Sequence, residues 1–116
     1  MSTTPDQAIV IFMTASSREE AEHLAGTLVN KRLAACVQIM PEMDSVFRWQ
    51  GKVERQREFL LIAKTVSSKF GEFESEVLKL HSYETPEIVA LALTAVSRPY
   101  LEWLSASVSE KRLSLD

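Results

Sequence analysis

Apolar and polar positions alternate in blocks along the chain, and each block has the period of one kind of element. Residues 8–14 form an unbroken apolar, β-branched run, which is typical of a central strand buried on both faces. Ser16 and Ser17 are each followed three residues later by a glutamate, the pattern of a capping box. Apolar residues then recur at helical spacing, which predicts an amphipathic helix with Lys31 and Arg32 in its last turn.

A long hairpin is predicted in the middle of the chain. Residues 33–40 have the pattern of a second strand, and Pro41 marks an edge strand, a bulge or a break. The strand pattern resumes at residues 46–49, and Gln50-Gly51 offers a tight turn. The return arm, residues 52–65, is polar in its first half and apolar in its second, so the hairpin is expected to project from the domain.

The second half of the chain repeats the strand-helix-strand pattern. Ser67 and Ser68 are candidate caps for a second helix, a loop follows over residues 81–86, and residues 87–95 predict a fourth strand. Pro99 suits the first turn of a short terminal helix. The two ends of the chain, residues 1–7 and 109–116, are expected to be flexible.

This order predicts a single α+β domain over residues 1–116, a ferredoxin-like βαββαβ antiparallel sheet with a long hairpin and a short C-terminal helix. Right-handed crossovers place the first and third strands in the middle and both main helices on one face. The central strands read as apolar on both sides, yet a chain of 116 residues has no further helix layer for the second face. We therefore expect an oligomer whose copies cover that face.

Composition and charge narrow the class of protein. Thirteen basic against sixteen acidic residues give a net charge of −3, so bulk electrostatics favours neither nucleic acid nor an anionic membrane as a partner. One cysteine, Cys36, cannot form an intramolecular disulfide and reads as a small buried hydrophobe. The N-terminal residues carry no signal-peptide pattern, and no catalytic motif is present. We expect a cytoplasmic protein that is not an enzyme.

His81 is the most informative titratable residue. It ends the second predicted helix, where a structural role as a cation at the helix end competes with use as a proton acceptor or metal ligand. Tyr83, Glu84 and Glu87 follow closely in the sequence. Met13 offers a soft sulfur that suits Cu(I), although methionine is more often core filler.

The return arm of the hairpin carries charges of both signs. Lys52, Glu58 and Lys64 share one parity and therefore face the same side of the predicted strand. They form either a solvated face with cross-strand ion pairs or a polar rim between subunits that binds a small anion. Trp49, at the hairpin tip, has the character of an apolar anchor for a partner.

Five short segments together resemble the CutA divalent-cation tolerance protein family, over roughly residues 8–108. Each segment is weak alone, but their order and separations in a chain of this length are specific. The segments are Leu33-Ala34-Ala35-Cys36, Trp49-Gln50-Gly51-Lys52-Val53-Glu54, Lys64-Thr65, His81-Ser82-Tyr83-Glu84-Thr85-Pro86-Glu87-Ile88 and Tyr100-Leu101-Glu102-Trp103-Leu104.

The resemblance implies a cytoplasmic homotrimer linked to tolerance of divalent cations, copper above all, with long hairpins packed against neighbouring copies. The family's proposed copper site combines a cysteine with two histidines, and those positions fall on Met13, Leu80 and His81 here. If the chain binds metal, His81 is the leading ligand, with Met13, Glu84 and Glu87 as candidate partners.

The implied trimer is also similar in architecture to P-II signalling proteins, which bind small effectors between subunits. The alternative function is therefore a signalling or adaptor trimer that binds a small anionic ligand in inter-subunit clefts. The candidate cleft residues are Trp49, Lys52, Glu58, Lys64, Tyr83 and Glu87.

Overall fold

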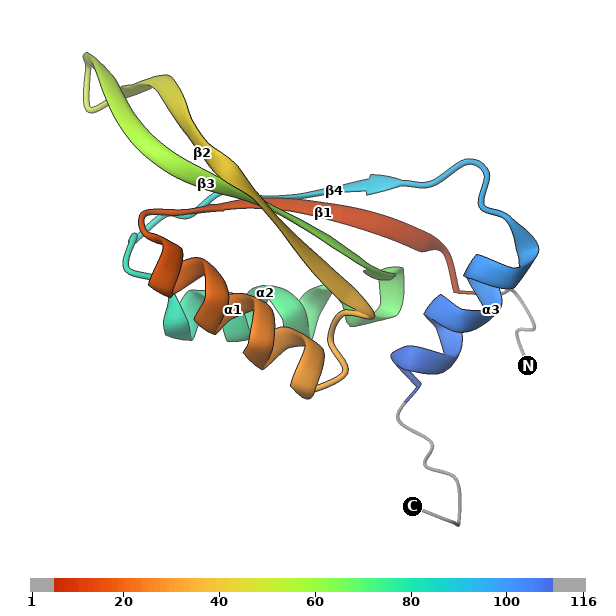
Figure 1. The fold of residues 1–116 in the computed structure, drawn as a ribbon. Helices are drawn as coiled ribbons and strands as arrows, with labels where there is room; N and C mark the ends of the chain where they lie inside the picture. The colour runs from red at the N-terminus through yellow and green to blue at the C-terminus, as the bar shows by residue number, and fades with distance from the viewer. Residues whose placement is uncertain (1–5, 110–116) are drawn as a thin grey trace.

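The computed structural model describes residues 6–109 as a four-stranded sheet with three α-helices (Figure 1). The sheet is antiparallel with the strand order β2-β3-β1-β4, which confirms the predicted α+β class and the central places of the first and third strands. In chain order the elements are β1 (Ala8–Ala15), α1 (Arg18–Asn30), β2 (Cys36–Trp49), β3 (Lys52–Val66), the short 3-10 helix η1 (Ser67–Lys69), α2 (Phe70–Leu80), β4 (Ile88–Ala92) and α3 (Arg98–Ser107).

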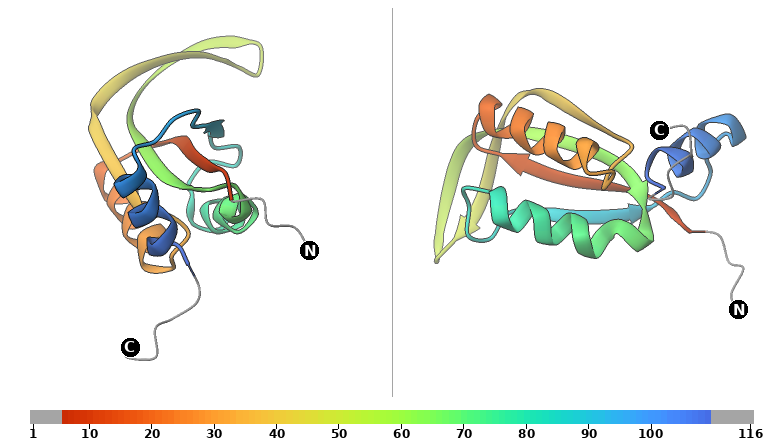
Figure 2. Two further views of the ribbon diagram at one scale, coloured as in Figure 1. Left: turned by 90° about the vertical axis from the view of Figure 1, so that its right-hand side faces the viewer. Right: turned by 90° about the horizontal axis from the view of Figure 1, so that it is seen from below.

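One face of the sheet carries the hydrophobic core. Helices α1 and α2 lie side by side under this face (Figures 1 and 2). Ile11, Met13 and Leu61 of the sheet are fully buried against Leu24 of α1 and Phe73 of α2. The core therefore sits between the central strands and the two helices, as the amphipathic stripes predict.

Among residues 6–109, no helix lies over the other face of the sheet (Figures 1 and 2). Because strand residues alternate between faces, the register that pairs Phe12 with Ile62 and Val89 puts these side chains together on this face. Val89 and Leu91 of β4 are 48% and 49% exposed. We call this surface the open face; its apolar members are Val10, Phe12, Leu60, Ile62, Val89 and Leu91.

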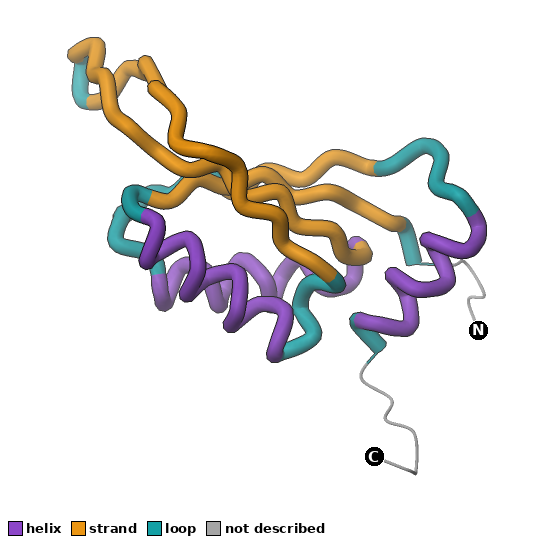
Figure 3. Tube along the Cα trace, in the orientation of Figure 1, coloured by secondary structure: helices purple, strands orange, loops and turns teal. Residues whose placement is uncertain are grey.

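The hairpin of β2 and β3 extends well beyond the other two strands and curves away from the helices (Figures 1 to 3). It gives the molecule its long axis, with extents of 50 × 30 × 25 Å. β2 lies at the sheet edge, and its pairing with β3 is irregular between Ile39 and Glu42, around Pro41. Of the three predicted alternatives for Pro41, an edge strand with a bulge is therefore confirmed, and β2 continues without a break.

Three predicted boundaries differ from the structure. α1 ends at Asn30, so Lys31 is its C-cap and Arg32 adopts a positive φ of 59°; the prediction of basic residues in the last turn is wrong. Residues 33–35 are a turn rather than a strand, because the N–H groups of residues 33 and 34 bond back to the carbonyl of Leu28. β4 ends at Ala92 because β1, its partner, begins at Ala8 and offers no further ladder.

The predicted caps of α2 have another role. Ser67 and Ser68 form η1, and both hydroxyls donate hydrogen bonds to the Asp6 carboxylate, as does the Ser68 N–H. Hydrogen bonding from Ser68 outweighs burial and holds the pKa of Asp6 below its usual value. Asp6 and Gln7, inside the segment expected to be flexible, are thus tied to η1; residues 1–5 and 110–116 lie outside the described residues.

None of the helices between residues 6 and 109 combines the length and hydropathy needed to span a membrane.

Candidate functional site

The end of β1 and the start of α1 form the floor of a polar network. Ser17 is the N-cap of α1, and its hydroxyl accepts a hydrogen bond from the Glu20 N–H at 3.1 Å. The Glu20 carboxylate reaches back and accepts hydrogen bonds from the N–H and the hydroxyl of Ser16, both at 2.9 Å. The predicted capping box is confirmed in a shifted form: the Glu20 carboxylate accepts the N–H of Ser16, the residue before the N-cap, and not the N–H of the N-cap itself.

Glu20 also joins the helix to the α2–β4 loop, which comprises residues 81–87. Its second carboxylate oxygen accepts a hydrogen bond from the Ser82 N–H at 2.7 Å. Burial alone would raise the pKa of Glu20, but the hydrogen bonds from Ser16 and Ser82 outweigh it and lower the pKa. The ionised carboxylate therefore fixes the loop against the start of α1.

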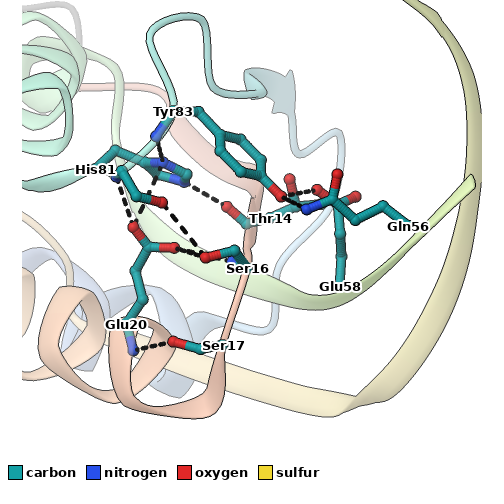
Figure 4. A network of polar contacts seen from close by, with 9 residues as sticks. Thr14, Ser16, Ser17, Glu20, Gln56, Glu58, His81 and Tyr83 are labelled. Atoms are coloured by element: carbon teal, nitrogen blue, oxygen red, sulfur yellow. Dashed lines mark hydrogen bonds and ion pairs between the residues drawn. The ribbon is translucent and has the colours of Figure 1, made fainter. Parts of the chain in front are cut away.

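His81 is the C-cap of α2, as predicted, and its side chain is fully buried. Its Nε2 lies 2.7 Å from the Thr14 carbonyl oxygen, which accepts hydrogen bonds, so Nε2 carries the proton. Its Nδ1 accepts a hydrogen bond from the Tyr83 N–H at 3.0 Å and lies 3.6 Å from the Glu20 carboxylate (Figure 4). This network assigns the neutral Nε2–H tautomer and uses both ring nitrogens.

The predicted metal ligands do not form a ready metal site. Met13 is fully buried in the core between the sheet and the helices, and neither nitrogen of His81 has a lone pair without a protein partner. Glu84 and Glu87 line the open pocket described below. Within residues 6–109, no group of three or more His, Cys, Asp or Glu side chains could hold a metal ion.

A pocket of about 690 Å³ lies between the hairpin and the α2–β4 loop. It brings together five predicted site residues, taken from the candidate metal ligands and the candidate cleft: Trp49, Glu58, Tyr83, Glu84 and Glu87. The rest of its lining is Thr14, Ser45, Val46, Phe47, Glu54, Gln56 and Thr85. Sequence reasoning missed Gln56 and Thr14; Gln56 shares the parity of Glu58 along β3, which is the signal that could have found it.

Two predicted cleft residues lie elsewhere. Lys52 is at the tip of the hairpin, paired with Trp49 in register, and does not line the pocket. Lys64 is near the other end of β3, where its Nζ donates a hydrogen bond to Gln38 at 3.0 Å and sits 5.7 Å from the Tyr100 ring centroid. Both lysines lie on the same face of β3 as Glu58, but each is six residues away from it along the strand.

Glu58, Tyr83 and Gln56 form the polar wall of the pocket. The Tyr83 hydroxyl donates a hydrogen bond to Glu58 Oε2 at 2.8 Å and accepts one from the Gln56 side-chain N–H at 2.9 Å (Figure 4). Burial and the adjacent Glu58 carboxylate raise the pKa of Tyr83 far above its usual value. Tyr83 therefore keeps its proton at neutral pH and acts as a hydrogen-bond donor.

Comparison with known proteins agrees with this fold. The family model described as "CutA1 divalent ion tolerance protein" matches residues 9–107. The "Divalent-cation tolerance protein CutA" of Thermus thermophilus is 45% identical over 95 residues, which cover 82% of this chain and 92% of the relative. "Protein CutA, chloroplastic" of Arabidopsis thaliana is 43% identical over 100 residues, which cover 86% of this chain and 55% of that longer protein.

A solved structure, that of the "Periplasmic divalent cation tolerance protein CutA" from Archaeoglobus fulgidus, superposes with a TM-score of 0.85 at 43% sequence identity. The superposition covers 88% of this chain and 99% of that one. The matches extend from β1 through α3 and include the hairpin and the α2–β4 loop. This chain therefore belongs to the CutA1 divalent ion tolerance protein family.

Proposed function

We propose that the chain acts in divalent-metal tolerance as a non-enzymatic homotrimer in the cytoplasm, with copper as the first ion to test. The observation that carries the oligomer is the open face, where apolar side chains of three strands are half-buried or exposed in a single copy. Contiguous apolar surface of this kind marks an interaction site. The number of copies follows from the family resemblance.

The hairpin supports the same assembly. Val46, Phe47, Trp49 and Val53 near its tip are 37–66% exposed, although the strand arms around them are largely polar. An extended arm with apolar side chains at its end suits packing against another copy of the chain. Light scattering on the purified protein should give three times the 13.1 kDa chain mass, and a monomer at micromolar concentration would contradict the proposal.

A matched pair of substitutions tests the open face itself. Val89 on β4 and Leu78 on the outer side of α2 are 48% and 49% exposed. Val89→Asp should dissociate the assembly, because it places a charge in the proposed interface, whereas Leu78→Asp should leave the mass unchanged. Equal masses for the two variants would show that the open face is not the contact.

The metal part of the proposal rests on family membership and predicts weak binding. A metal at His81 Nδ1 would take the lone pair that now accepts the Tyr83 N–H, and the loop would lose that hydrogen bond. Calorimetry with Cu(II) and Zn(II) on wild type, His81→Ala and His23→Ala tests this, since His23 is exposed on α1. Isotherms that do not change in His81→Ala would remove His81 as a ligand.

The anion-binding alternative is not favoured by the pocket. Four glutamates line it, and none of its lining residues, all within the described part of the chain, is lysine, arginine or histidine. An anion would therefore enter a field of its own sign. A thermal-shift screen with nucleotides and organic acids checks this, because a ligand of the native state raises the melting temperature.

The cytoplasmic location is supported by the single cysteine, which fits a reducing compartment. The names of two relatives point to a chloroplast and to a periplasm, so location varies in the family. Fractionation of the source cells is the direct test, and recovery of the chain in a periplasmic or organellar fraction would contradict the proposal.

A further inference from the structure

Glu58 is a buried carboxylate that has no counter-charge among residues 6–109. Its side chain belongs to β3 on the open face, at the point where the hairpin begins to curve away, and the residue is 6% exposed. The Tyr83 hydroxyl donates one hydrogen bond to Oε2. Among the described residues, no hydrogen-bond donor reaches Oε1, and no lysine, arginine or histidine forms an ion pair with this carboxylate.

This arrangement is costly for a carboxylate. The group offers lone pairs for about four hydrogen bonds, and one is made. Removal of a charge from water is compensated in proteins by an opposite charge or by several donors. Glu58 lines the 690 Å³ pocket, so the space that could supply a positive group adjoins its free oxygen.

The rest of the pocket lining also favours a positively charged ligand. Glu54, Glu84 and Glu87 add three further carboxylates to the lining, and all three are exposed. Trp49 and Tyr83 contribute aromatic rings, with Phe47 on the hairpin side. Carboxylates attract a cation, and aromatic faces attract an ammonium or guanidinium group and accommodate its alkyl chain.

A bare metal ion fits this pocket less well than an organic cation. A divalent ion needs several donor groups converging on one point, and no such group of three His, Cys, Asp or Glu side chains exists in residues 6–109. The pocket volume is also far larger than one ion, and four of its twelve lining residues are aromatic or aliphatic.

We propose that the pocket between the hairpin and the α2–β4 loop is a binding site for an organic cation whose ammonium or guanidinium group pairs with Glu58. Trp49 and Phe47 contact the alkyl part, and Glu54, Glu84 and Glu87 attract a second positive group. The cation is either a free amine or the side chain of a lysine or arginine from a second copy of the chain. The site does not depend on metal binding, but it shares Glu58 of the open face and the hairpin residues Trp49 and Phe47 with the surfaces of the assembly proposed above.

Calorimetry with 1,5-diaminopentane tests the free amine. Wild type should bind it, Glu58→Gln should lose affinity by about tenfold or more, and Glu74→Gln should bind as wild type does. Glu74 is an exposed glutamate of α2 that does not line the pocket, so it controls for net charge. Potassium chloride at matched ionic strength and magnesium chloride complete the controls; heat from magnesium equal to that from the diamine would overturn the proposal.

Light scattering on the same variants tests whether the cation is a lysine or arginine side chain from a second copy of the chain. If a basic side chain of another copy already pairs with Glu58, wild type gives no diamine heat, and Glu58→Gln lowers the assembled mass while Glu74→Gln does not. The proposal fails if the diamine does not bind and Glu58→Gln keeps the wild-type mass. It also fails if the diamine binds equally to Glu58→Gln.

Glu87→Gln keeps the test decisive if Glu58→Gln does not fold. Glu87 is exposed before β4, so its substitution leaves the folded state intact, which circular dichroism checks. It should weaken either the diamine affinity, by about threefold or more, or the assembly. A variant that changes neither quantity would overturn the proposal.

Discussion

Thr65 is the one buried side chain in residues 6–109 whose polar atom has no hydrogen-bond partner. It is fully buried in β3, opposite Ile9 of β1. A buried hydroxyl without a partner loses its hydration and gains no hydrogen bond in return. The position is thus a local cost in an otherwise apolar part of the core.

Thr65→Val should therefore stabilise the protein by about 1 kcal/mol, because the methyl group keeps the shape and removes the unsatisfied hydroxyl. Urea unfolding at fixed protein concentration measures the change. Thr94→Val, at an exposed position, is the control and should change stability by less than about 0.5 kcal/mol. A lower midpoint for Thr65→Val would mean that the hydroxyl has a partner in solution.

Glu20 determines a pH dependence whose sign follows from its lowered pKa. Because the folded-state pKa lies below the ordinary value of 4.5, the carboxylate stabilises the fold fully above that value and loses its contribution as the pH falls through the folded-state pKa. Glu20→Gln should cost about 1–3 kcal/mol at pH 7, and this difference should shrink at pH 3.

Urea unfolding of wild type and Glu20→Gln at pH 7, 5, 4 and 3 checks this expectation. Glu19→Gln is the matched control, since Glu19 is the exposed neighbour on the same helical turn. A difference between wild type and Glu20→Gln that does not vary with pH would contradict the role of the ionised carboxylate.

For single residues, the sequence identifies the important side chains more reliably than it identifies their hydrogen-bond partners. The capping box and the end of α2 at His81 could be located from local spacing. The hydrogen bond from His81 to the Thr14 carbonyl joins residues 67 positions apart, so no local pattern contains it. The same holds for the Tyr83 hydroxyl on Glu58, 25 positions away.

Among the elements, the hairpin turn is fully specified by two residues. Gln50 and Gly51 have φ values of 50° and 80°, the left-handed pair of a type I′ turn. Glycine adopts this conformation without the steric cost that a Cβ brings. The sequence Gln50-Gly51 could therefore be interpreted correctly, and so could the long arms on either side of it.

Gly51→Ala should destabilise the protein by about 1 kcal/mol through the strained φ at the turn. Gly26→Ala is the internal contrast, because Gly26 lies inside α1 and an added Cβ there meets nothing within 4 Å. That change should stabilise the protein by about 0.4–1 kcal/mol through the unfolded state. Chemical denaturation of both variants measures the pair, and equal signs would contradict the account.

The misplaced element ends have tertiary causes. β4 stops where its partner β1 begins, although the apolar pattern continues beyond Ala92. Ser67 and Ser68 follow the sequence pattern of helix caps, but their hydroxyls donate hydrogen bonds to the Asp6 carboxylate instead. In both cases a residue far away in the chain decides the outcome, and a window of local sequence does not include it.

For the whole molecule, the open face makes stability depend on concentration. If copies bury this face, raising the protein concentration about a hundredfold should raise the melting temperature by several degrees through mass action. Differential scanning fluorimetry or calorimetry measures this, and Val89→Asp should remove the dependence. A melting temperature independent of concentration would contradict assembly through this face.

The sheet topology and its uncovered face could be predicted, because both follow from element order and from strands that are apolar on both sides. The pocket could not. It needs the curvature of the hairpin toward the α2–β4 loop, which brings Trp49 and Glu87 to one cavity although 38 positions separate them. Shared parity correctly places Lys52 and Lys64 on the same face of β3 as Glu58, but parity determines the face of a strand and not the position along it.

The central place of β1 has a consequence for synthesis on the ribosome. β1 emerges first, yet its two neighbours are β3 and β4, the second of which ends at Ala92. The β2–β3 hairpin closes locally and early, whereas the edge of β1 that pairs with β4 stays unpaired until β4 has been synthesised. For that period an apolar strand edge is available to other nascent chains, including copies of itself. Slow elongation before residue 88 prolongs this exposure, so aggregation during expression should depend on translation speed in that stretch.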